Sequence, residues 1–172
     1  PLPINIFVGP ESELNTLREM LAAGARLITL VGPGGVGKTR LALETCVREA
    51  SRYLGGALFI SLESLLLPDL VLSEIALKLS IGQIGDSTPL ESLITTLAGR
   101  HLLLCIDNWE HIVEAGPQIA PLLTACPDIH VLATSREALR IRGERIFRVD
   151  PLNQPSADVT SADATLLKEE IE

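Results

Sequence analysis

The chain has 172 residues, of which 47% are hydrophobic and only 3% aromatic, which suits one α/β domain with an aliphatic core and excludes two ordinary domains. Its 14 basic and 22 acidic residues give a formal net charge of −8, which argues against direct binding of a nucleic-acid backbone by this segment. No apolar run is long enough to span a bilayer and no signal peptide opens the chain, so a cytoplasmic protein without a membrane partner is expected.

Apolar runs that are typical of buried strands alternate with helical patterns along the chain. Strands are expected at residues 27–31, 57–61, 101–106, 129–134 and 145–149, and helices at 11–23, 38–53, 69–79, 89–98 and 117–125. The side chains that the second of these helices is expected to bury are Leu41, Ala42, Cys46, Val47 and Ala50. Strands that alternate with helices predict right-handed crossovers and a doubly wound parallel sheet.

The two ends of the chain are expected to lie outside this pattern. Residues 1–9 are interpreted as an extended lead-in, residues 151–161 as a linker, and residues 162–172 as the opening of another helix. The chain begins without a methionine and ends abruptly, as a domain excised from a longer protein would.

The most specific motif lies between the first strand and the helix that follows it. Residues 32–39, GPGGVGKT, match the phosphate-binding pattern G-x-x-x-x-G-K-[ST]. The loop needs glycines because backbone N–H groups can surround a polyphosphate only where side chains do not block the approach. Lys38 is expected to reach the β- and γ-phosphates, and Thr39 to give its hydroxyl to Mg²⁺. The alternative is a glycine-rich turn that carries Lys-Thr by chance, and the flanking strand and helix patterns argue against it.

A carboxylate that could hold Mg²⁺ from the other side follows the most apolar run of the chain. Residues 102–106, LLLCI, lead directly to Asp107, the pattern by which P-loop proteins supply this ligand. The alternative is an Asp that caps or closes a turn. An acid directly after this Asp commonly orients the attacking water, but Asn108 stands in that position. Glu110 is the nearest acid, and it is equally well explained as a group that orients the water or as a solvated loop residue.

A basic residue follows the strand expected at 129–134. Arg136 would stand at the carboxyl edge of the parallel sheet, where ligands bind, and its planar fork suits a γ-phosphate. The alternative is a structural ion pair with Glu137 or another acid nearby. The tetrapeptide Asn-Lys-x-Asp, by which guanine-specific P-loop proteins read the base, does not occur in the sequence, so adenine is favoured.

Four motifs in a fixed order give the chain a resemblance to a known class of proteins. They are FVGPE at residues 7–11, the phosphate-binding loop at 32–39, LCIDNWEH at 104–111 and ATSRE at 133–137. Over about residues 6–152, the chain resembles the STAND class of signalling ATPases, whose nucleotide-binding domains are NB-ARC-like. More narrowly, it resembles the bacterial regulators related to AfsR and to large LuxR-type proteins.

The resemblance implies a fold and a domain organisation. It implies a P-loop NTPase three-layer sandwich with a five-stranded parallel sheet, in which the strand at 129–134 lies between those at 27–31 and 101–106. Residues 1–152 would form the nucleotide-binding domain. Residues 153–172 would be a linker and the start of a truncated helical subdomain.

The resemblance also implies roles for the matching residues. Val8 would lie near the adenine, Asp107 would hold Mg²⁺ together with Thr39, and Arg136 would sense the γ-phosphate. Pro10 stands where the family usually has Arg, so any contact made by that Arg is not expected here. The residues expected to bind the nucleotide are Val8, Gly34, Gly35, Val36, Gly37, Lys38, Thr39 and Arg40. Those expected to act in hydrolysis are Lys38, Asp107, Glu110 and Arg136.

These patterns predict an ATP- and ADP-binding switch domain with slow Mg²⁺-dependent ATP hydrolysis, taken from a multidomain signalling or transcriptional regulator. Its expected partners are the adenine nucleotide, other domains of the same polypeptide and, depending on the nucleotide, further copies of itself. The alternative is a P-loop scaffold that holds ADP as a structural element, which Asn108 in place of an acid favours. A small-molecule kinase is less well supported, because no arginine-rich lid insertion is evident in the sequence.

Overall fold

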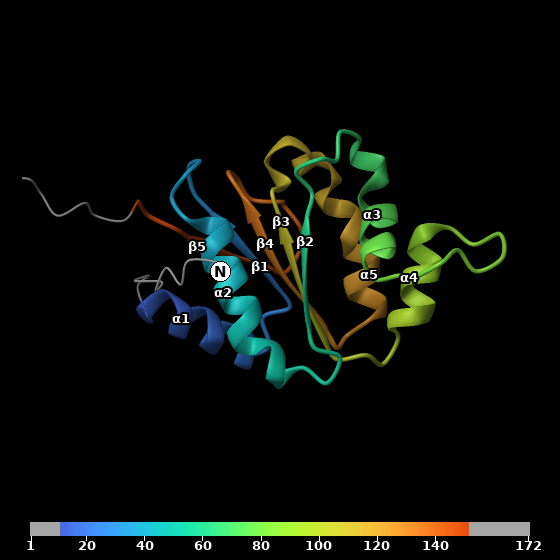
Figure 1. The fold of residues 1–172 in the computed structure, drawn as a ribbon, viewed down its shortest axis with the longest axis horizontal. Helices are drawn as coiled ribbons and strands as arrows, with labels where there is room; N and C mark the ends of the chain where they lie inside the picture. The colour runs from blue at the N-terminus through green and yellow to red at the C-terminus, as the bar shows by residue number, and fades with distance from the viewer. Residues whose placement is uncertain (1–10, 152–172) are drawn as a thin grey trace, which may run out of the picture.

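The computed structural model describes residues 11–151, and in it five strands form one sheet between two layers of helices (Figure 1). The strands are β1 (Leu27–Val31), β2 (Ala57–Ser61), β3 (Leu102–Asp107), β4 (Ile129–Ser135) and β5 (Glu144–Arg148). They lie in the order β2-β3-β4-β1-β5, and each neighbouring pair is parallel. The predicted parallel sheet is therefore confirmed, with β4 between β1 and β3.

Helices cover both faces of this sheet. One face carries α1 (Glu11–Ala22) and α2 (Lys38–Glu49), and the other carries α3 (Val71–Lys78), α4 (Pro89–Leu97) and α5 (Ala120–Ala125) (Figure 1). Short 3-10 helices occupy Ala50–Arg52, Pro68–Leu70, Trp109–His111 and Val113–Ile119. Within residues 11–151, no helix combines the length and the apolar character needed to cross a membrane.

Two predicted helices begin with 3-10 geometry in the structure, and the helix expected at residues 69–79 is α-helical only from Val71, after a 3-10 turn at Pro68–Leu70. The helix expected at residues 117–125 is α-helical only from Ala120, because the chain from Val113 to Ile119 has the tighter 3-10 geometry. Pro117 lies inside that 3-10 segment, and its ring removes the N–H that an α-helix would use.

The three central strands, β1, β3 and β4, are buried on both faces, which explains their predominantly apolar sequences. In β3, the side chains of Leu102, Leu104 and Ile106 belong to the core on the α3–α5 side of the sheet. Leu103 and Cys105 belong to the core on the α1–α2 side. All six residues of β3 are buried, so the packed core holds Asp107, the polar residue at the end of the strand, in a fixed position.

The buried face of α2 was predicted wrongly at one residue. Leu41, Ala42 and Cys46 are buried as expected, and Ala50 is half-buried. Val47, however, is 67% exposed, while the polar residues Thr45 and Glu49 are buried in its place. Both are hydrogen-bonded, Thr45 to the carbonyl of Leu41 and Glu49 to Arg52, which offsets the cost of removing them from water.

Candidate functional site

The loop between β1 and α2 has a backbone that favours glycine, as Gly37 and Gly32 show. Gly37, directly before α2, has a φ of 97°, in the left-handed region that side chains disfavour. At Gly32, a Cβ atom would lie 2.5 Å from the carbonyl oxygen of Val149, so no side chain fits there. The loop leads into the amino end of α2, where main-chain N–H groups without helical partners favour an anion.

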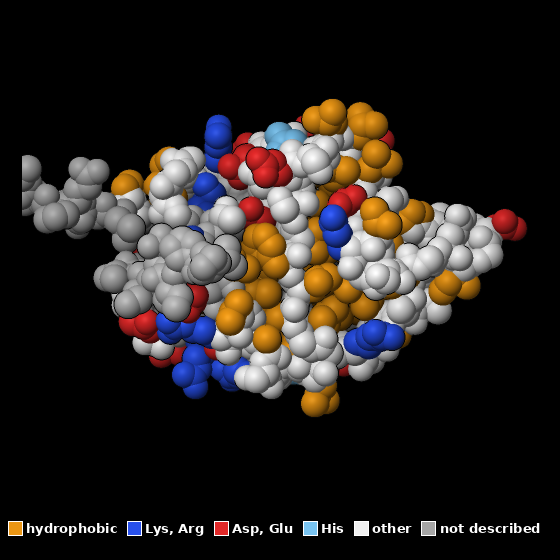
Figure 2. All heavy atoms as spheres, viewed as in Figure 1, with side chains coloured by type: hydrophobic (Ala, Val, Ile, Leu, Met, Phe, Trp, Pro, Cys, Tyr) orange, Lys and Arg blue, Asp and Glu red, His pale blue; other side chains and the backbone are white. Residues whose placement is uncertain are grey.

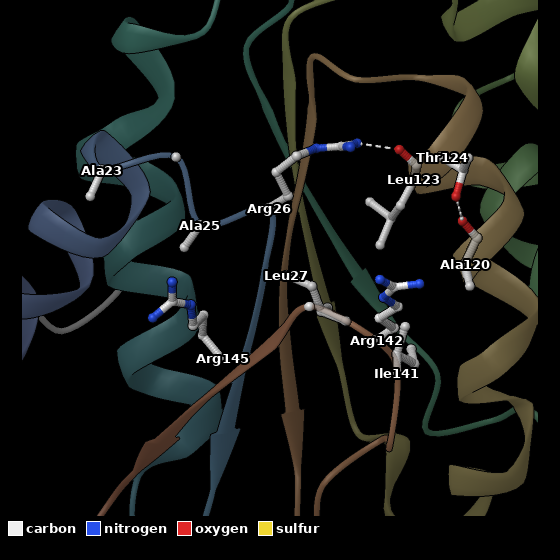
Figure 3. Close-up of a pocket in the computed structure, with 12 residues that line it drawn as sticks. Ala23, Ala25, Arg26, Leu27, Ala120, Leu123, Thr124, Ile141, Arg142 and Arg145 are labelled. Carbon is white, nitrogen blue, oxygen red and sulfur yellow. Dashed lines mark hydrogen bonds between the residues drawn. The ribbon is translucent and has the colours of Figure 1, made fainter.

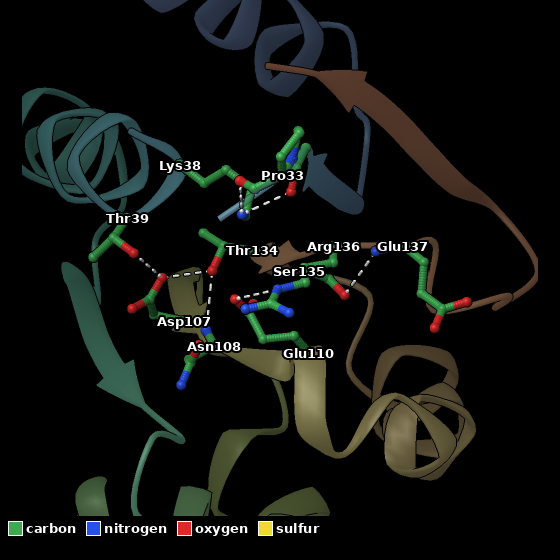
Figure 4. Close-up of polar contacts among 11 residues, drawn as sticks. Pro33, Lys38, Thr39, Asp107, Asn108, Glu110, Thr134, Ser135, Arg136 and Glu137 are labelled. Atoms are coloured by element: carbon green, nitrogen blue, oxygen red, sulfur yellow. Dashed lines mark hydrogen bonds and ion pairs between the residues drawn. The ribbon is translucent and has the colours of Figure 1, made fainter. Parts of the chain in front are cut away.

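Lys38, the first residue of α2, is held against this loop. Its side chain is buried, and its Nζ donates hydrogen bonds to the carbonyl oxygens of Gly32 at 2.8 Å and Pro33 at 2.9 Å (Figure 4). A positive charge is therefore fixed at the loop, where it can be shared with the oxygens of a phosphate.

Asp107, at the end of β3, is oriented by two hydroxyl groups. Its Oδ1 accepts hydrogen bonds from Thr39 at 2.9 Å and from Thr134 at 2.5 Å (Figure 4). Thr134 in turn accepts a hydrogen bond from the main-chain N–H of Asn108 at 3.0 Å. The predicted pair of Thr39 and Asp107 is thus brought together, although the two residues are 68 positions apart in the sequence.

The oxygen atoms of this pair fit Mg²⁺ chemically. A hydroxyl and a carboxylate are hard ligands, and Mg²⁺ in nucleotide sites takes few protein ligands and completes its shell with water and phosphate oxygens. Within the described part of the chain, no group of three or more His, Cys, Asp or Glu side chains could hold a metal by itself. Such an ion would therefore depend on a nucleotide for much of its coordination.

The turn after β3 decides where Glu110 lies. Asn108 has a φ of 71°, so the chain reverses there in the left-handed conformation that Asn tolerates. Trp109 then enters the core and is fully buried, which anchors the short 3-10 helix. Glu110 follows on the other side, with its side chain 18% exposed and directed at Arg136 (Figure 4).

Arg136, just beyond β4, lies between this acid and the phosphate-binding loop. Its Nε is 3.6 Å from Oε1 of Glu110, and one of its terminal nitrogens is 3.6 Å from the position that a Cβ atom on Gly34 would take. Glu137, the other predicted partner of Arg136, is paired with Arg140 instead. The structure therefore brings Arg136 and Glu110 together beside the loop, as an ion pair whose arginine side chain is 67% exposed.

Glu110 has one oxygen without a partner. Its Oε2 is buried, and no hydrogen bond reaches it from any residue between 11 and 151. A buried unpaired carboxylate oxygen is costly unless a ligand, water or proton satisfies it. Glu110 is therefore not the solvated loop residue that was one of the two interpretations of the sequence.

The other predicted site residues are found on the loop and at its ends. Gly34, Gly35 and Val36 form the loop between β1 and α2, and Arg40 lies exposed on the first turn of α2. Val8 lies outside the described residues, so its expected place near the adenine stays a prediction.

Thr134 is a site residue that the sequence analysis did not single out. In the sheet, Ile106 of β3 pairs with Ala133 of β4, which places the next residues, Asp107 and Thr134, side by side. The signal was a hydroxyl residue at the end of the strand predicted to neighbour the one that ends in Asp107. Recognising it required the strand order and the register together.

A cavity of about 550 Å³ lies at the opposite end of the sheet and is formed partly by Arg26, Leu123, Arg142 and Arg145 (Figure 3). Arg26 donates hydrogen bonds to the carbonyl oxygens of Leu123 at 2.5 Å and Cys126 at 2.6 Å at the end of α5, and the carbonyl of Cys126 also accepts from the N–H of Ile129. Its guanidinium thereby stabilises a helix end, and the cavity is separate from the phosphate-binding loop.

Comparison with known sequences relates the chain to bacterial regulators. No protein-family model matches it. The chain is 35% identical over 145 residues to a candidate HTH-type transcriptional regulator of Mycobacterium tuberculosis, and the match covers 84% of this chain but 16% of that protein. It is 27% identical over 170 residues to the regulatory protein AfsR of Streptomyces griseus, with 91% of this chain and 17% of AfsR covered. The chain thus spans about a sixth of the length of these relatives.

Comparison with solved structures identifies the fold. Cdc6p from Pyrobaculum aerophilum superimposes with a TM-score of 0.61 at 16% identity, covering 82% of this chain and 45% of that one. A chain of the Drosophila ORC bound to DNA superimposes with a TM-score of 0.65 at 16% identity, covering 83% and 43%. At this identity the likeness concerns the fold alone, and it is that of the P-loop NTPases.

Proposed function

We propose that this chain is the nucleotide-binding domain of a larger signalling or transcriptional regulator, that it binds ATP and ADP with Mg²⁺, and that it hydrolyses ATP slowly. The observation that carries the proposal is the convergence of Lys38, Thr39 and Asp107 at one edge of the sheet. These residues come from two different elements, and each has the chemistry that a nucleotide phosphate or its Mg²⁺ needs.

The phosphates would be bound by the loop and by Lys38. The ammonium of Lys38 already lies against the loop carbonyls, so it needs no long movement to share its hydrogen bonds with phosphate oxygens. The amino end of α2 adds a partial positive charge directed at the same place.

Mg²⁺, when bound, would neutralise charge on the phosphates, and Thr39 and Asp107 would hold it. Asp107 uses Oδ1 for both hydroxyl groups, and no residue among those described donates a hydrogen bond to its Oδ2. Oδ2 is therefore the oxygen left for the ion or for a water molecule that the ion carries.

Arg136 and Glu110 supply the elements of a response to the γ-phosphate. Arg136 lies over the loop and is held by Glu110, so a third phosphate would compete with Glu110 for the guanidinium. If Arg136 moved to the phosphate, Glu110 would be released next to the site with its charge free to orient water. The neutral Asn108 beside Asp107 is consistent with slow hydrolysis.

The place of the domain in a regulator is supported by its relatives and by the resemblance to STAND ATPases. Two relatives are regulators by name, and the chain spans only a small part of each. The NB-ARC-like character, the switch role and the position of Val8 all belong to this proposal.

Calorimetric titration of the 172-residue chain with ATP and ADP, with and without Mg²⁺, tests the proposal. Binding that strengthens with Mg²⁺ is expected, and Lys38→Ala is expected to weaken both nucleotides by about 1.5–3 kcal/mol. Absence of binding at millimolar nucleotide would refute it.

The second candidate is a scaffold that holds ADP without turnover. The ion pair between Glu110 and Arg136 favours it, because a paired Glu110 is not free to orient water. Single-turnover measurements separate the two functions. Release of phosphate from bound ATP supports the switch, whereas nucleotide binding without any release over hours selects the scaffold.

A further inference from the structure

The cavity of about 550 Å³ at the amino end of the sheet is lined by three arginines and by no acidic residue. It lies between the segment that joins α1 to β1, the end of α5 and the turn before β5 (Figure 3). Its volume is in the usual range for sites that bind small molecules, about 300–1,000 Å³. Leu27, Leu123 and Ile141 contribute apolar side chains to its wall. The cavity therefore combines an apolar wall with charge of one sign.

Arg26 leaves part of its guanidinium without acceptors. Its Nη2 donates to the main-chain carbonyls of Leu123, Cys126 and Ile129. Its Nε is buried and has no hydrogen-bond partner within residues 11–151, and Nη1 makes no hydrogen bond to these residues either. A buried N–H without an acceptor is costly, so the oxygen of a ligand at this place would remove that cost.

Two further arginines line the same cavity, and both belong to the segment that opens β5. Arg142 lies in a turn that is closed by a hydrogen bond from the N–H of Glu144 to the carbonyl of Ile141. In Figure 3, Arg142 lies on the α5 side of Leu27, and Arg145 lies on the other side. No ion pair within residues 11–151 includes either of these arginines.

The acid closest to them in sequence is already bonded. Glu144 lies between Arg142 and Arg145, but its two oxygens accept hydrogen bonds from the main-chain N–H groups of Leu139 at 2.8 Å and Arg140 at 2.9 Å. These bonds tie the end of β5 to the chain that leads into it. Glu144 could neutralise an arginine of the cavity only by giving them up.

Basic side chains elsewhere on the molecule lie beside acidic ones. Figure 2 shows blue and red side chains together at several places on the face that it draws, and Arg48 and Lys78 each pair with a glutamate one helical turn away. The whole chain has a formal net charge of −8, so acidic partners are plentiful. A hollow that is lined by charge of one sign and has low-dielectric walls attracts ions of the opposite sign. The cavity thus has the charge of an anion site within an acidic protein.

We propose that this cavity binds a small organic anion, with its phosphate or carboxylate oxygens on Arg26 and Arg142 and its apolar part against Leu123 and Ile141. Planar guanidinium groups match both kinds of oxygen group, so phosphate and carboxylate share one recognition chemistry. Arg145 adds positive charge that draws the anion in. The site is separate from the phosphate-binding loop, and it does not depend on the proposed nucleotide function.

Titration of the isotope-labelled 172-residue chain with phenyl phosphate, followed by NMR, is the first test. Phenyl phosphate joins an anionic group to an apolar ring. It is expected to shift the amide signals of Gly24, Thr124 and Gly143, which line the cavity, and to bind there about tenfold more tightly than inorganic phosphate. Benzoate, the carboxylate counterpart, should shift the same signals. Absence of these shifts with both organic anions would overturn the proposal.

Matched arginine variants locate the contact. Arg142→Ala changes an exposed side chain and keeps the bonds of Arg26 to α5, so folding should not depend on it. It is expected to weaken phenyl phosphate at the cavity about tenfold. Arg100→Ala is the control, because Arg100 is exposed just before β3, at the same end of the sheet, and does not line the cavity. Equal affinities of both variants and the unchanged chain would refute the site.

Lys38→Ala separates this site from the phosphate-binding loop. Phenyl phosphate bound at the loop would shift the amides of Gly35 and Gly37, and Lys38→Ala should reduce those shifts while keeping the ones at the cavity. This result is expected whether or not the chain binds nucleotides. Cavity shifts that disappear in Lys38→Ala would show that they report on the loop, and they would overturn the second site.

A peptide of residues 162–172 distinguishes a free ligand from an acidic segment of the same polypeptide. Its sequence, ADATLLKEEIE, also combines acidic with apolar residues. If the peptide displaced phenyl phosphate at a lower concentration than benzoate does, the cavity would belong to this segment and the small ligand would be refuted. Displacement by benzoate and not by the peptide supports the small organic anion.

Discussion

The two ends of the parallel sheet both carry polar side chains, but they use them differently. At the carboxyl end, Lys38, Asp107 and Arg136 surround the phosphate-binding loop, and buried Oε2 of Glu110 has no partner within residues 11–151. Lys38 is bonded to the loop, Asp107 to Thr39 and Arg136 to Glu110, and a ligand can replace each of these contacts.

At the amino end, Tyr53, His130 and the terminal nitrogen of Arg26 bond to one another or to the backbone, although Nε of Arg26 has no partner within residues 11–151. Tyr53 Oη and His130 Nδ1 lie 3.2 Å apart in a hydrogen bond, and the rings of Tyr53 and His101 pack with their centroids 4.5 Å apart. Burial, helped by the negative charge of Glu49, raises the pKa of Tyr53 to about 12, so its hydroxyl keeps its proton. Arg26 completes this end by binding the carbonyls at the end of α5.

The comparison separates binding from stability. Residues at the carboxyl end should affect nucleotide affinity while changing the free energy of unfolding little. Residues at the amino end should do the reverse.

The largest expected effect is on stability, at Arg26. Arg26→Met removes the side-chain donor to the carbonyl of Leu123 and one of the two donors to the carbonyl of Cys126, so the free energy of unfolding should fall by about 3 kcal/mol. Urea unfolding measures this loss. Nucleotide affinity of the folded variant should be unchanged, and a loss of affinity without a loss of stability would contradict the comparison.

The next effect is on affinity, at Arg136. If Arg136 reads the γ-phosphate, Arg136→Ala should weaken ATP binding by about 2 kcal/mol and leave ADP binding nearly unchanged. Calorimetry with both nucleotides measures the difference, and Lys38→Ala, which should weaken both, is the control. Equal losses for ATP and ADP would show that Arg136 only pairs with Glu110.

A smaller effect is expected at Thr134, which positions Asp107. Thr134→Val keeps the shape but removes the hydroxyl bonded to Oδ1, so the Mg²⁺-dependent part of ATP affinity should fall by about 1.5 kcal/mol. Thr134→Ser restores the hydroxyl and should restore the affinity. If Thr134→Val weakened binding equally with and without Mg²⁺, its role would be packing and not the orientation of Asp107.

The smallest expected effect is the pH dependence at His130. Burial lowers the pKa of His130, the charges of His101 and Arg26 lower it further, and Asp128 opposes them. In the unfolded chain this group titrates near the ordinary value of about 6.5, so the unfolded state takes up the proton first. Stability is therefore full above about pH 6.5 and decreases as the pH falls below it, until the lowered pKa of the folded state is passed.

Urea unfolding of the chain and of His130→Gln on both sides of this pH window measures the contribution. The unchanged chain should lose more stability on acidification than the variant does. An equal loss in both would mean that His130 is not the group responsible.

Much of the fold followed from local patterns. Residues 102–106 are apolar throughout because their strand is buried on both faces, so the sequence showed a parallel sheet covered by helices. Local patterns failed where polar side chains are buried with partners, as at Thr45 and Glu49 of α2, while Val47 turns outward. The spacing of apolar residues gives no sign of these buried polar residues, because their burial depends on hydrogen bonds to particular partners.

The site was predicted in its parts. Lys38 and Thr39 belong to a motif whose residues are contiguous, and Asp107 and Arg136 follow strands whose ends must meet at one edge. The roles of Val8 and of the whole site in nucleotide binding stay predictions, as does the expectation that this segment does not bind nucleic acid.

By itself, the sequence determined the loop, the strands and the residues that end them, because these depend on neighbours in the chain. Only the tertiary structure decided that Thr134 orients Asp107, that Glu110 holds Arg136, and that β2 and β5 form the edges of the sheet. Those relations join residues far apart in sequence, and they are set by strand order, register and the turn at Asn108. A one-residue change in register would move each side chain to the other face of the sheet, so no local pattern could have fixed them.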